Sequence, residues 1–306
     1  MIDYSHVPVT IAMPVFNGEA YMAQALDSLL SQTFTNFELI ISDNASSDRT
    51  EEIARHYASM DPRIRYYRND TNLGAGWNQN RVIQLGRGKY FLMAHHDDVR
   101  APEYIERTLA VLAADPSIVV CYTKTQDIDE HGNPLPRTDP PLDIDSHDRV
   151  RRFCEIIRMD HICEAGFGLI RMDVLRKTVM HGNYADSDRV LLAELALYGR
   201  LFQIPECLFF RRAHAKQSTE VCPDRQSRTA QWFNPQHQEK IFFPHVRQFV
   251  EYLRVIHRVP ISVRDRKACL AGMLKWLRVN RRRIVYDLRV AAFQVLRKGW
   301  RLAFGT

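Results

Sequence analysis

The chain has 306 residues, of which 45% are apolar and 25% charged, as is typical of a soluble globular protein. This length allows one large α/β domain with an appendage, or two small domains. There is no uninterrupted apolar run of about 18 residues and no basic leader, so we expect neither a membrane-spanning helix nor a signal peptide. The six cysteines form no C-x-x-C pair, which indicates reduced thiols in a cytoplasmic protein.

The net charge of +6 is unevenly distributed along the chain. Between Arg247 and Arg301, 15 Lys or Arg residues stand beside three acidic ones, a local balance of +12 that leaves −6 for the remainder. This asymmetry predicts contact with an anionic surface, either a membrane or a nucleic acid. No recognised nucleic-acid-binding motif accompanies the charge, so we do not expect nucleic acid as a partner.

Strand and helix patterns alternate regularly through the first part of the chain. Apolar runs of strand length alternate with helical spacing in the order 9–15, 20–30, 37–42, 48–58, 64–67, 77–85, 90–94, 102–114 and 118–122. Such alternation predicts βαβ units and a mostly parallel sheet flanked by helices. Ligands of open parallel sheets bind beyond the carboxyl ends of the strands, so these ends are the place to look for a site.

The second part of the chain is more varied. Glycine and four prolines predict a long loop at 126–148, and residues 222–234 are polar and irregular. Helices are expected at 149–159, 172–180 and 188–198, a strand at 201–212, and helices from 235 onward with a break near Pro260. We therefore expect an α/β domain at 1–220 and a basic helical extension at 235–306.

Polar residues follow four successive strands, in segments 14–18, 43–48, 72–74 and 95–98. A nucleotide base needs fixed donors and acceptors, which Asp43 and the backbone near Pro14 could supply. Neither of the common glycine-rich phosphate loops is present, so a diphosphate would need a metal or basic side chains. Asp97 is a candidate metal ligand, because Mg²⁺ and Mn²⁺ prefer carboxylate oxygens and share their sphere with substrate phosphates.

A set of short motifs then makes a family resemblance specific. In chain order they are Met13-Pro-Val-Phe-Asn-Gly, Ala25-Leu-Asp-Ser-Leu-Leu-Ser-Gln-Thr, Glu38-Leu-Ile-Ile-Ser-Asp-Asn-Ala-Ser-Ser-Asp, Asn72-Leu-Gly, Asn80, Gly88-Lys-Tyr-Phe, Ser187-Asp188, Gly199 and Phe210-Arg-Arg-Ala-His214. Residues 9–218, about two thirds of the chain, resemble the family 2 glycosyltransferases with the GT-A fold. Each motif is weak alone, and their order and spacing carry the resemblance.

The resemblance implies an inverting transfer of a sugar from a nucleoside-diphosphate sugar, UDP-sugar favoured, to a hydroxyl acceptor. The expected acceptor is a saccharide or a lipid-linked molecule, in bacterial polysaccharide, O-antigen or glycolipid synthesis. It also implies Mn²⁺ or Mg²⁺ as cofactor. The expected fold is a GT-A α/β domain with a helical C-terminal extension.

The resemblance further assigns roles to individual residues. Arg211 and Arg212 could contact the diphosphate or pair with surface carboxylates, and Gly166 and Phe167 fall in the acceptor region. Nucleotide binding is assigned to Pro14, Val15, Asn17, Asp43, Asn72, Gly74, Asn80 and His96.

The metal-binding motif departs from the family pattern. Asp97 falls on the last carboxylate of the D-x-D motif, and His214 falls near a position that can help to bind metal or diphosphate. His95 stands where the first Asp is usual, so it either ligates metal or ribose, or leaves Asp97 with less support. A histidine ligand favours Mn²⁺ over Mg²⁺. Gln79 stands where many members have Arg.

Asp188 falls on the family's catalytic base, which removes the proton from the acceptor hydroxyl during a single displacement. The transition state is expected to resemble an oxocarbenium ion. A simple helix cap is the other interpretation of Asp188, because Asp is favoured at helix starts. Asp186 is the nearest competitor for the catalytic role.

Two other functions stay open. A sugar nucleotidyltransferase has a related sheet but usually carries a glycine-rich loop ending in Lys, which residues 13–20 lack. A catalytically decayed binding scaffold remains an alternative because of His95.

The basic extension has two interpretations, packing on the body or lying on an anionic membrane surface at the inner face of a membrane. Basic residues Arg289, Lys298 and Arg301 surround its apolar stripe. The stripe consists of Ile284, Leu288, Ala291, Ala292, Val295 and Leu296.

Overall fold

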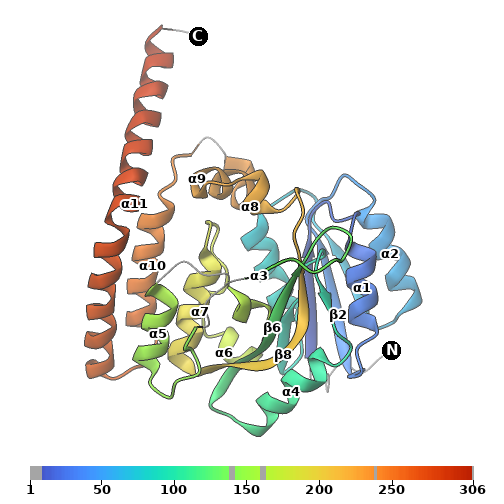
Figure 1. Ribbon diagram of the computed structural model, residues 1–306. Coiled ribbons are helices and arrows are strands. Elements are labelled where there is room, and N and C mark those ends of the chain that lie inside the picture. The colour runs from blue at the N-terminus through green and yellow to red at the C-terminus, as the bar shows by residue number, and fades with distance from the viewer. Residues whose placement is uncertain (1–8, 138–141, 159–162, 238–239, 305–306) are drawn as a thin grey trace.

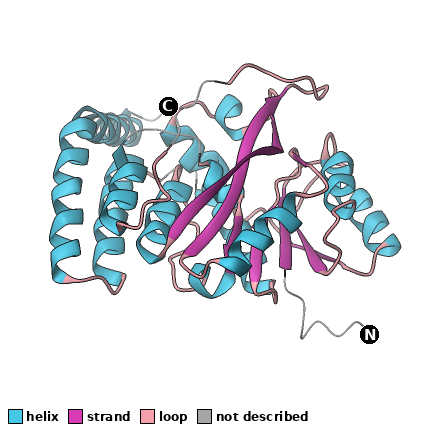
Figure 2. Ribbon diagram, turned by 60° about the horizontal axis from the view of Figure 1, so that its bottom comes forward, coloured by secondary structure: helices cyan, strands magenta, loops and turns pink. Residues whose placement is uncertain are grey.

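The computed structural model describes residues 9–137, 142–158, 163–237 and 240–304, which form an α/β body and a long C-terminal helix (Figure 1). An eight-stranded sheet runs through the body, with helices on both of its faces (Figure 2). Its spatial order is β3-β2-β1-β4-β7-β6-β8-β5. The strands are β1 Val9–Val15, β2 Phe37–Asp43, β3 Ile64–Arg68, β4 Tyr90–Met93, β5 Val99–Arg100, β6 Ile118–Ile128, β7 Leu169–Arg171 and β8 Arg200–Arg212.

Strands β1 to β4 pair in parallel in the order β3-β2-β1-β4, as the alternating pattern predicts. Strand β1 is buried along its length because its two faces enter different cores: Ile11 and Met13 face one, and Ala12 faces the other. Helices on one face of the sheet are α1 Met22–Leu30, α2 Thr50–Met60 and α4 Tyr104–Ala114; those on the other are α3 Ala75–Leu85, α5 Arg149–Arg158 and α7 Ser187–Tyr198.

The second half of the sheet differs in detail from expectation. Strand β6 continues to Ile128, six residues past the expected end, because it pairs in parallel with β8 along almost its whole length. The short strands β5 and β7 were not expected, and both pair antiparallel to their neighbours. The helix expected at 172–180 ends at Leu175 as α6 Met172–Leu175, because the chain then turns at Thr178 and Met180 has a positive φ of 57°.

Residues 222–234, expected to be irregular, lie within a segment that folds into short helical turns. These are α8 Ser218–Val221, α9 Arg225–Arg228, a π-helical turn Thr229–Phe233 and a 3₁₀ turn Pro235–His237. The close approach between Gly74 and the backbone of Phe233 packs them against the loop that precedes α3.

The C-terminal extension forms an antiparallel pair of helices, α10 Pro244–Arg258 and α11 Val263–Phe304. Their break at 259–262 contains Pro260, as expected. Helix α10 packs against α7 and α11 against α5, and Tyr252 and Trp276 join the core of the body. The near part of the extension therefore packs on the body, while the far end of α11 projects away from it (Figure 1). Among the described residues, no helix is both long and apolar enough to cross a bilayer.

Candidate active site

A cavity of about 550 Å³ opens at the carboxyl ends of β1 and β4. Residues 214–219 and 225–233 line its other side. The structure thus brings together most of the site residues that the sequence suggests. Those that line the cavity are Pro14, Val15, Asn17, Asn72, His95, His96, Asp97, Phe167, Asp188, Arg211 and His214.

Interlocking hydrogen bonds fix the polar strand ends. Asn17 has a positive φ of 52°, and its side-chain oxygen accepts a hydrogen bond from the Ser47 amide at 2.9 Å. The side chain of Asn44 donates to the Asn72 oxygen at 2.8 Å and accepts from the Asn69 side chain at 2.8 Å. The bonds of Asn44 and Asn69 satisfy buried amides, and together with the Asn17–Ser47 bond they hold the loops at the strand ends in one arrangement.

Asp43 and Arg212, predicted to bind ligand, lie outside the cavity lining. The carboxylate of Asp43 is fully buried; it accepts from the Ser46 amide at 2.8 Å and the Tyr66 hydroxyl at 2.9 Å, and pairs with Arg68. The guanidinium of Arg212 donates to the carbonyls of residues 97, 129 and 130 at 3.0–3.1 Å. Both side chains are therefore held by contacts within the fold around the cavity, and the binding roles expected for them stay predictions.

Three further predicted residues also lie outside the lining: Gly74, Asn80 and Gly166. Gly74 has a positive φ of 90° and no room for a side chain beside Phe233. The Asn80 amide donates to the His181 carbonyl at 2.7 Å and accepts from its N–H at 2.8 Å. Asn80 thus fixes the backbone of His181, which lines the cavity.

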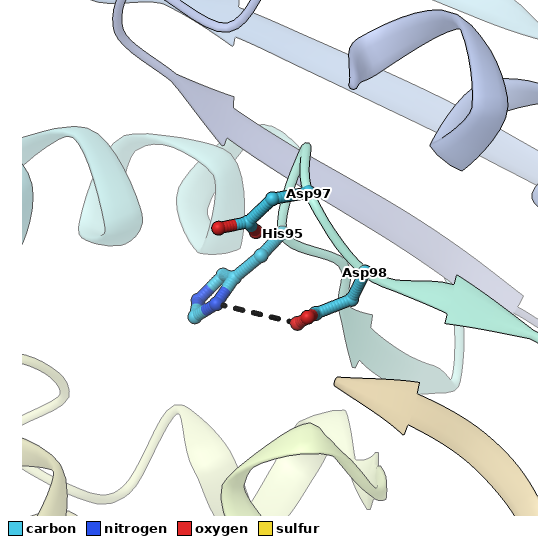
Figure 3. A group of neighbouring side chains, drawn as sticks. All are labelled: His95, Asp97 and Asp98. Carbon is cyan, nitrogen blue, oxygen red and sulfur yellow. Dashed lines mark ion pairs between the residues drawn. The ribbon is translucent and has the colours of Figure 1, made fainter. Parts of the chain in front are cut away.

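His95, Asp97 and Asp98 form a cluster whose ligand atoms all lie within 4.8 Å of one another (Figure 3). Two carboxylates and an imidazole suit Mn²⁺. Asp97 also lies 3.0 Å from Nε2 of His214. Nδ1 of His214 is buried with no hydrogen-bond partner among the described residues. This donor set fits a divalent cation, and His95, Asp97, Asp98 and His214 all line the cavity.

The charges of the cluster are shifted by burial and by one another. Burial alone would raise the pKa of Asp97, but the hydrogen bond from His214 and the neighbouring imidazoles lower it. Burial and the charge of Asp97 raise the pKa of Asp98, which accepts a hydrogen bond from the Arg212 amide at 3.0 Å. Burial lowers the pKa of His95 to about 4. His95 is thus neutral near pH 7, the form that can ligate a metal.

Asp188 lies in the first turn of α7 and faces the cavity. Its carboxylate accepts hydrogen bonds from the Arg189 amide at 2.9 Å and from the Cys163 thiol. Burial raises the pKa of Asp188, and the charge of Asp186 adds to this shift. A carboxylate with a raised pKa in a cavity wall is a candidate general base.

The cationic wall of the cavity was missed by the sequence analysis. Arg225 and Arg228 come from α9, and Lys216 precedes α8. Trp232 follows in the π-helical turn. The two arginines and the aromatic pair at 232–233 could have indicated a ligand-binding segment, although this part of the sequence has no periodicity. Arg211 lines the cavity but makes a two-pronged ion pair with Asp127, at 2.8 and 2.9 Å.

Gln79, which stands where many family members have Arg, also lines the cavity. Its Oε1 is buried and has no hydrogen-bond partner among the described residues. The cavity thus offers an acceptor, and no positive charge, at this position.

Sequence comparisons identify relatives for the N-terminal half. The "Glycosyl transferase family 2" model matches residues 10–179, more than half of the chain. An uncharacterized glycosyltransferase, MJ1057 of Methanocaldococcus jannaschii, is 31% identical over 134 residues, 43% of this chain and 46% of the relative. Chondroitin synthase of Escherichia coli is 33% identical over 125 residues, 41% of this chain and 18% of the relative. The chain thus spans less than half of the length of these two relatives.

Solved structures share the fold at low sequence identity. TarS of S. aureus, residues 1–349 in complex with UDP, has a TM-score of 0.57 at 17% identity; the match covers 95% of this chain and 92% of the other. The mannosyltransferase PcManGT of Pyrobaculum calidifontis, in complex with GDP-Man and Mn²⁺, has a TM-score of 0.59 at 14% identity, covering 97% and 76%. The GT-A fold with helical C-terminal region is confirmed, and the chain belongs to glycosyl transferase family 2.

Proposed function

We propose that this chain transfers a sugar from a nucleoside-diphosphate sugar to a hydroxyl acceptor, with inversion at the anomeric carbon. One observation carries the proposal: a single cavity holds the carboxylate–imidazole cluster of Asp97 and His95, the half-buried carboxylate of Asp188, and a cationic wall. UDP is the favoured nucleotide, because the TarS structures contain UDP and UDP-GlcNAc and match over almost the whole chain. The bacterial chondroitin synthase supports a saccharide acceptor.

The donor fits the cavity in one direction. The nucleoside lies against the strand ends at Pro14, Asn17 and Asn72, and the diphosphate lies toward Asp97 and the cationic wall. A divalent cation held by Asp97 and His95 would supply Lewis acidity to the departing diphosphate. Lys216 and Arg228 line the same cavity and are further candidate phosphate ligands.

Asp188 then acts on the acceptor. Its carboxylate removes the proton from the acceptor hydroxyl while that oxygen forms a bond to the anomeric carbon. The bond from this carbon to the diphosphate oxygen breaks on the opposite face, and the electron pair leaves with the nucleoside diphosphate. Phe167 lines the cavity and stacks at 5.0 Å on Phe209, which gives the acceptor region an apolar floor.

Thermal unfolding with nucleotides tests this proposal. We expect UDP with Mn²⁺ to raise the unfolding midpoint, since a ligand that binds only the folded state stabilises it, by about 2.7 kcal/mol at 100 times its Kd. GDP, TDP and CMP, each with Mn²⁺, Mg²⁺ or EDTA, serve as comparisons. If no nucleotide stabilises the protein under any condition, the proposal fails and a decayed scaffold is the better interpretation.

We also propose that the outer face of α11 binds an anionic membrane surface, on the cytoplasmic side, where a lipid-linked acceptor would lie. Leu288, Phe293 and Val295 are exposed there, at 53%, 66% and 56%. Arg282 and Arg289 are exposed on the same stretch. Apolar side chains among arginines are complementary to anionic headgroups above an acyl layer, and each basic residue contributes about 1 kcal/mol near such a surface.

Vesicle sedimentation measures this second proposal. We expect the protein to sediment with vesicles of 30% phosphatidylglycerol in phosphatidylcholine, and much less with phosphatidylcholine alone or at high salt. The double variant Leu288→Glu, Phe293→Glu should lose binding. Met60→Glu, at an equally exposed position on α2, should keep it. Equal sedimentation of all three proteins, or of none, would exclude this surface.

A further inference from the structure

A chain of polar contacts connects α11 to the wall of the cavity. At its far end, the Asp287 carboxylate of α11 accepts the His245 amide at 2.8 Å and the Val246 amide at 3.2 Å. It also lies 2.8 Å from Nδ1 of His245. Asp287 is fully buried and His245 nearly so. The carboxylate therefore caps the first turn of α10 and fixes the ring of His245.

The remaining contacts in this series reach the cavity. One terminal nitrogen of Arg225 lies 3.0 Å from Nε2 of His245, and Nε of Arg225 pairs with the Asp186 carboxylate. Arginine has only donors, so Nε2 of His245 must accept and the ring proton must be on Nδ1, where Asp287 accepts it. Each contact thus determines the next, and Arg225 and Asp186 both line the cavity.

Capping of α10 explains why Asp287 is buried at this position, but it does not explain the contact between His245 and Arg225. Arg225 in turn contacts Asp186, which directly precedes α7 and has a positive φ of 65°. Such a backbone conformation is unfavourable for a non-glycine residue and persists only where its surroundings hold it. Two residues further on is Asp188. The contacts of Asp186 therefore set the position of the turn that carries the proposed base.

We propose that His245 and Asp287 are positioning residues for sugar transfer, which hold Arg225 against Asp186 and thereby place Asp188. This inference depends on the proposed function, because it assumes that Asp188 is the base. It gives the C-terminal helices a role in the reaction, although His245 lies about 57 residues from Asp188 along the chain.

The electrostatics agree with this geometry. The groups facing Asp188 are Asp186, whose charge raises its pKa, and Arg189 and the Cys163 thiol, which lower it. Arg225 neutralises Asp186 from α9. When Arg225 is no longer held, the charge of Asp186 acts on Asp188 without that compensation, so the base would titrate at higher pH.

The pH dependence of transfer by His245→Leu tests the inference. We expect about a tenfold lower kcat and an acid limb displaced to higher pH. His245→Gln, which restores a hydrogen-bonding side chain, should recover part of both effects. His257→Leu is the matched control, an exposed histidine on the same helix, and should behave as wild type.

Two outcomes would overturn the inference: a kcat and pH profile of His245→Leu equal to those of His257→Leu, or a lower kcat with no displacement of the acid limb. If His245→Leu does not fold, Asp287→Asn replaces it, because the amide keeps one acceptor oxygen and should preserve the fold. A pH profile of Asp287→Asn equal to that of wild type would then overturn the inference. A wild-type protein without transfer activity contradicts the proposed function instead, so the two failures are distinct.

Discussion

Asp97→Ala should lower the transfer rate at least a thousandfold and abolish metal-dependent stabilisation by UDP. Asp97 contributes the carboxylate of the cluster that faces the cavity, and it is the hydrogen-bond partner of His214. The variant therefore loses a metal ligand and leaves an imidazole without its partner. Thermal unfolding with UDP and Mn²⁺, followed by a transfer assay, measures both effects.

Asp173→Ala provides the control, because Asp173 is a 71% exposed carboxylate on α6 that pairs only across one helical turn with Lys177. It should retain activity and stabilisation. If UDP with Mn²⁺ stabilises Asp97→Ala as much as wild type, or stabilises wild type equally in EDTA, the cation is not what holds the diphosphate. The cationic wall at Lys216 and Arg228 would then carry that role.

Asp188→Asn should lower kcat by about 10²–10⁴-fold while UDP still stabilises the protein. The amide has nearly the shape of the carboxylate and can still accept from the Arg189 amide, but it cannot take a proton from the acceptor. In wild type, activity should fall as the pH falls through the raised pKa of Asp188, at a higher pH than for an ordinary aspartate, because burial and Asp186 favour the protonated form. A pH–rate profile of both proteins provides the measurement.

Asp186→Asn separates the two candidate bases. It should retain more activity than Asp188→Asn, because Asp186 is already paired with Arg225 and Arg189. The reverse order would make Asp186 the base and Asp188 a helix-start residue. Equal activity of all three proteins would contradict a carboxylate base on α7.

The strand-end residues could be found from the sequence because parallel strands bring their carboxyl ends to one edge. That rule places Pro14, Asn72 and Asp97 around one cavity without knowledge of side-chain contacts. It does not say which strand-end side chains are satisfied within the fold. The carboxylate of Asp43 accepts from Tyr66 and pairs with Arg68, both from the neighbouring strand β3, and only the tertiary structure shows these contacts.

The cationic wall was beyond sequence reasoning for a different reason. Residues 222–234 have no helical or strand periodicity, and their turns form through contacts with distant segments. The Asn234 amide, for example, donates to the Asn183 carbonyl at 2.8 Å. Strands β5 and β7 have two and three residues, too few for an alternating pattern to be visible. Pairing with longer neighbours makes them strands.

The length of helix α11 has a geometric consequence. It spans 42 residues, which corresponds to about 63 Å at 1.5 Å per residue. Only its near part packs on the body, so the remainder is a stiff spacer that projects beyond the body (Figure 1). Four residues added to the spacer would move the tip by about 6 Å and turn its outer face by about 40°. Insertions in this helix would therefore change both the reach and the orientation of the exposed face that we propose for membrane binding.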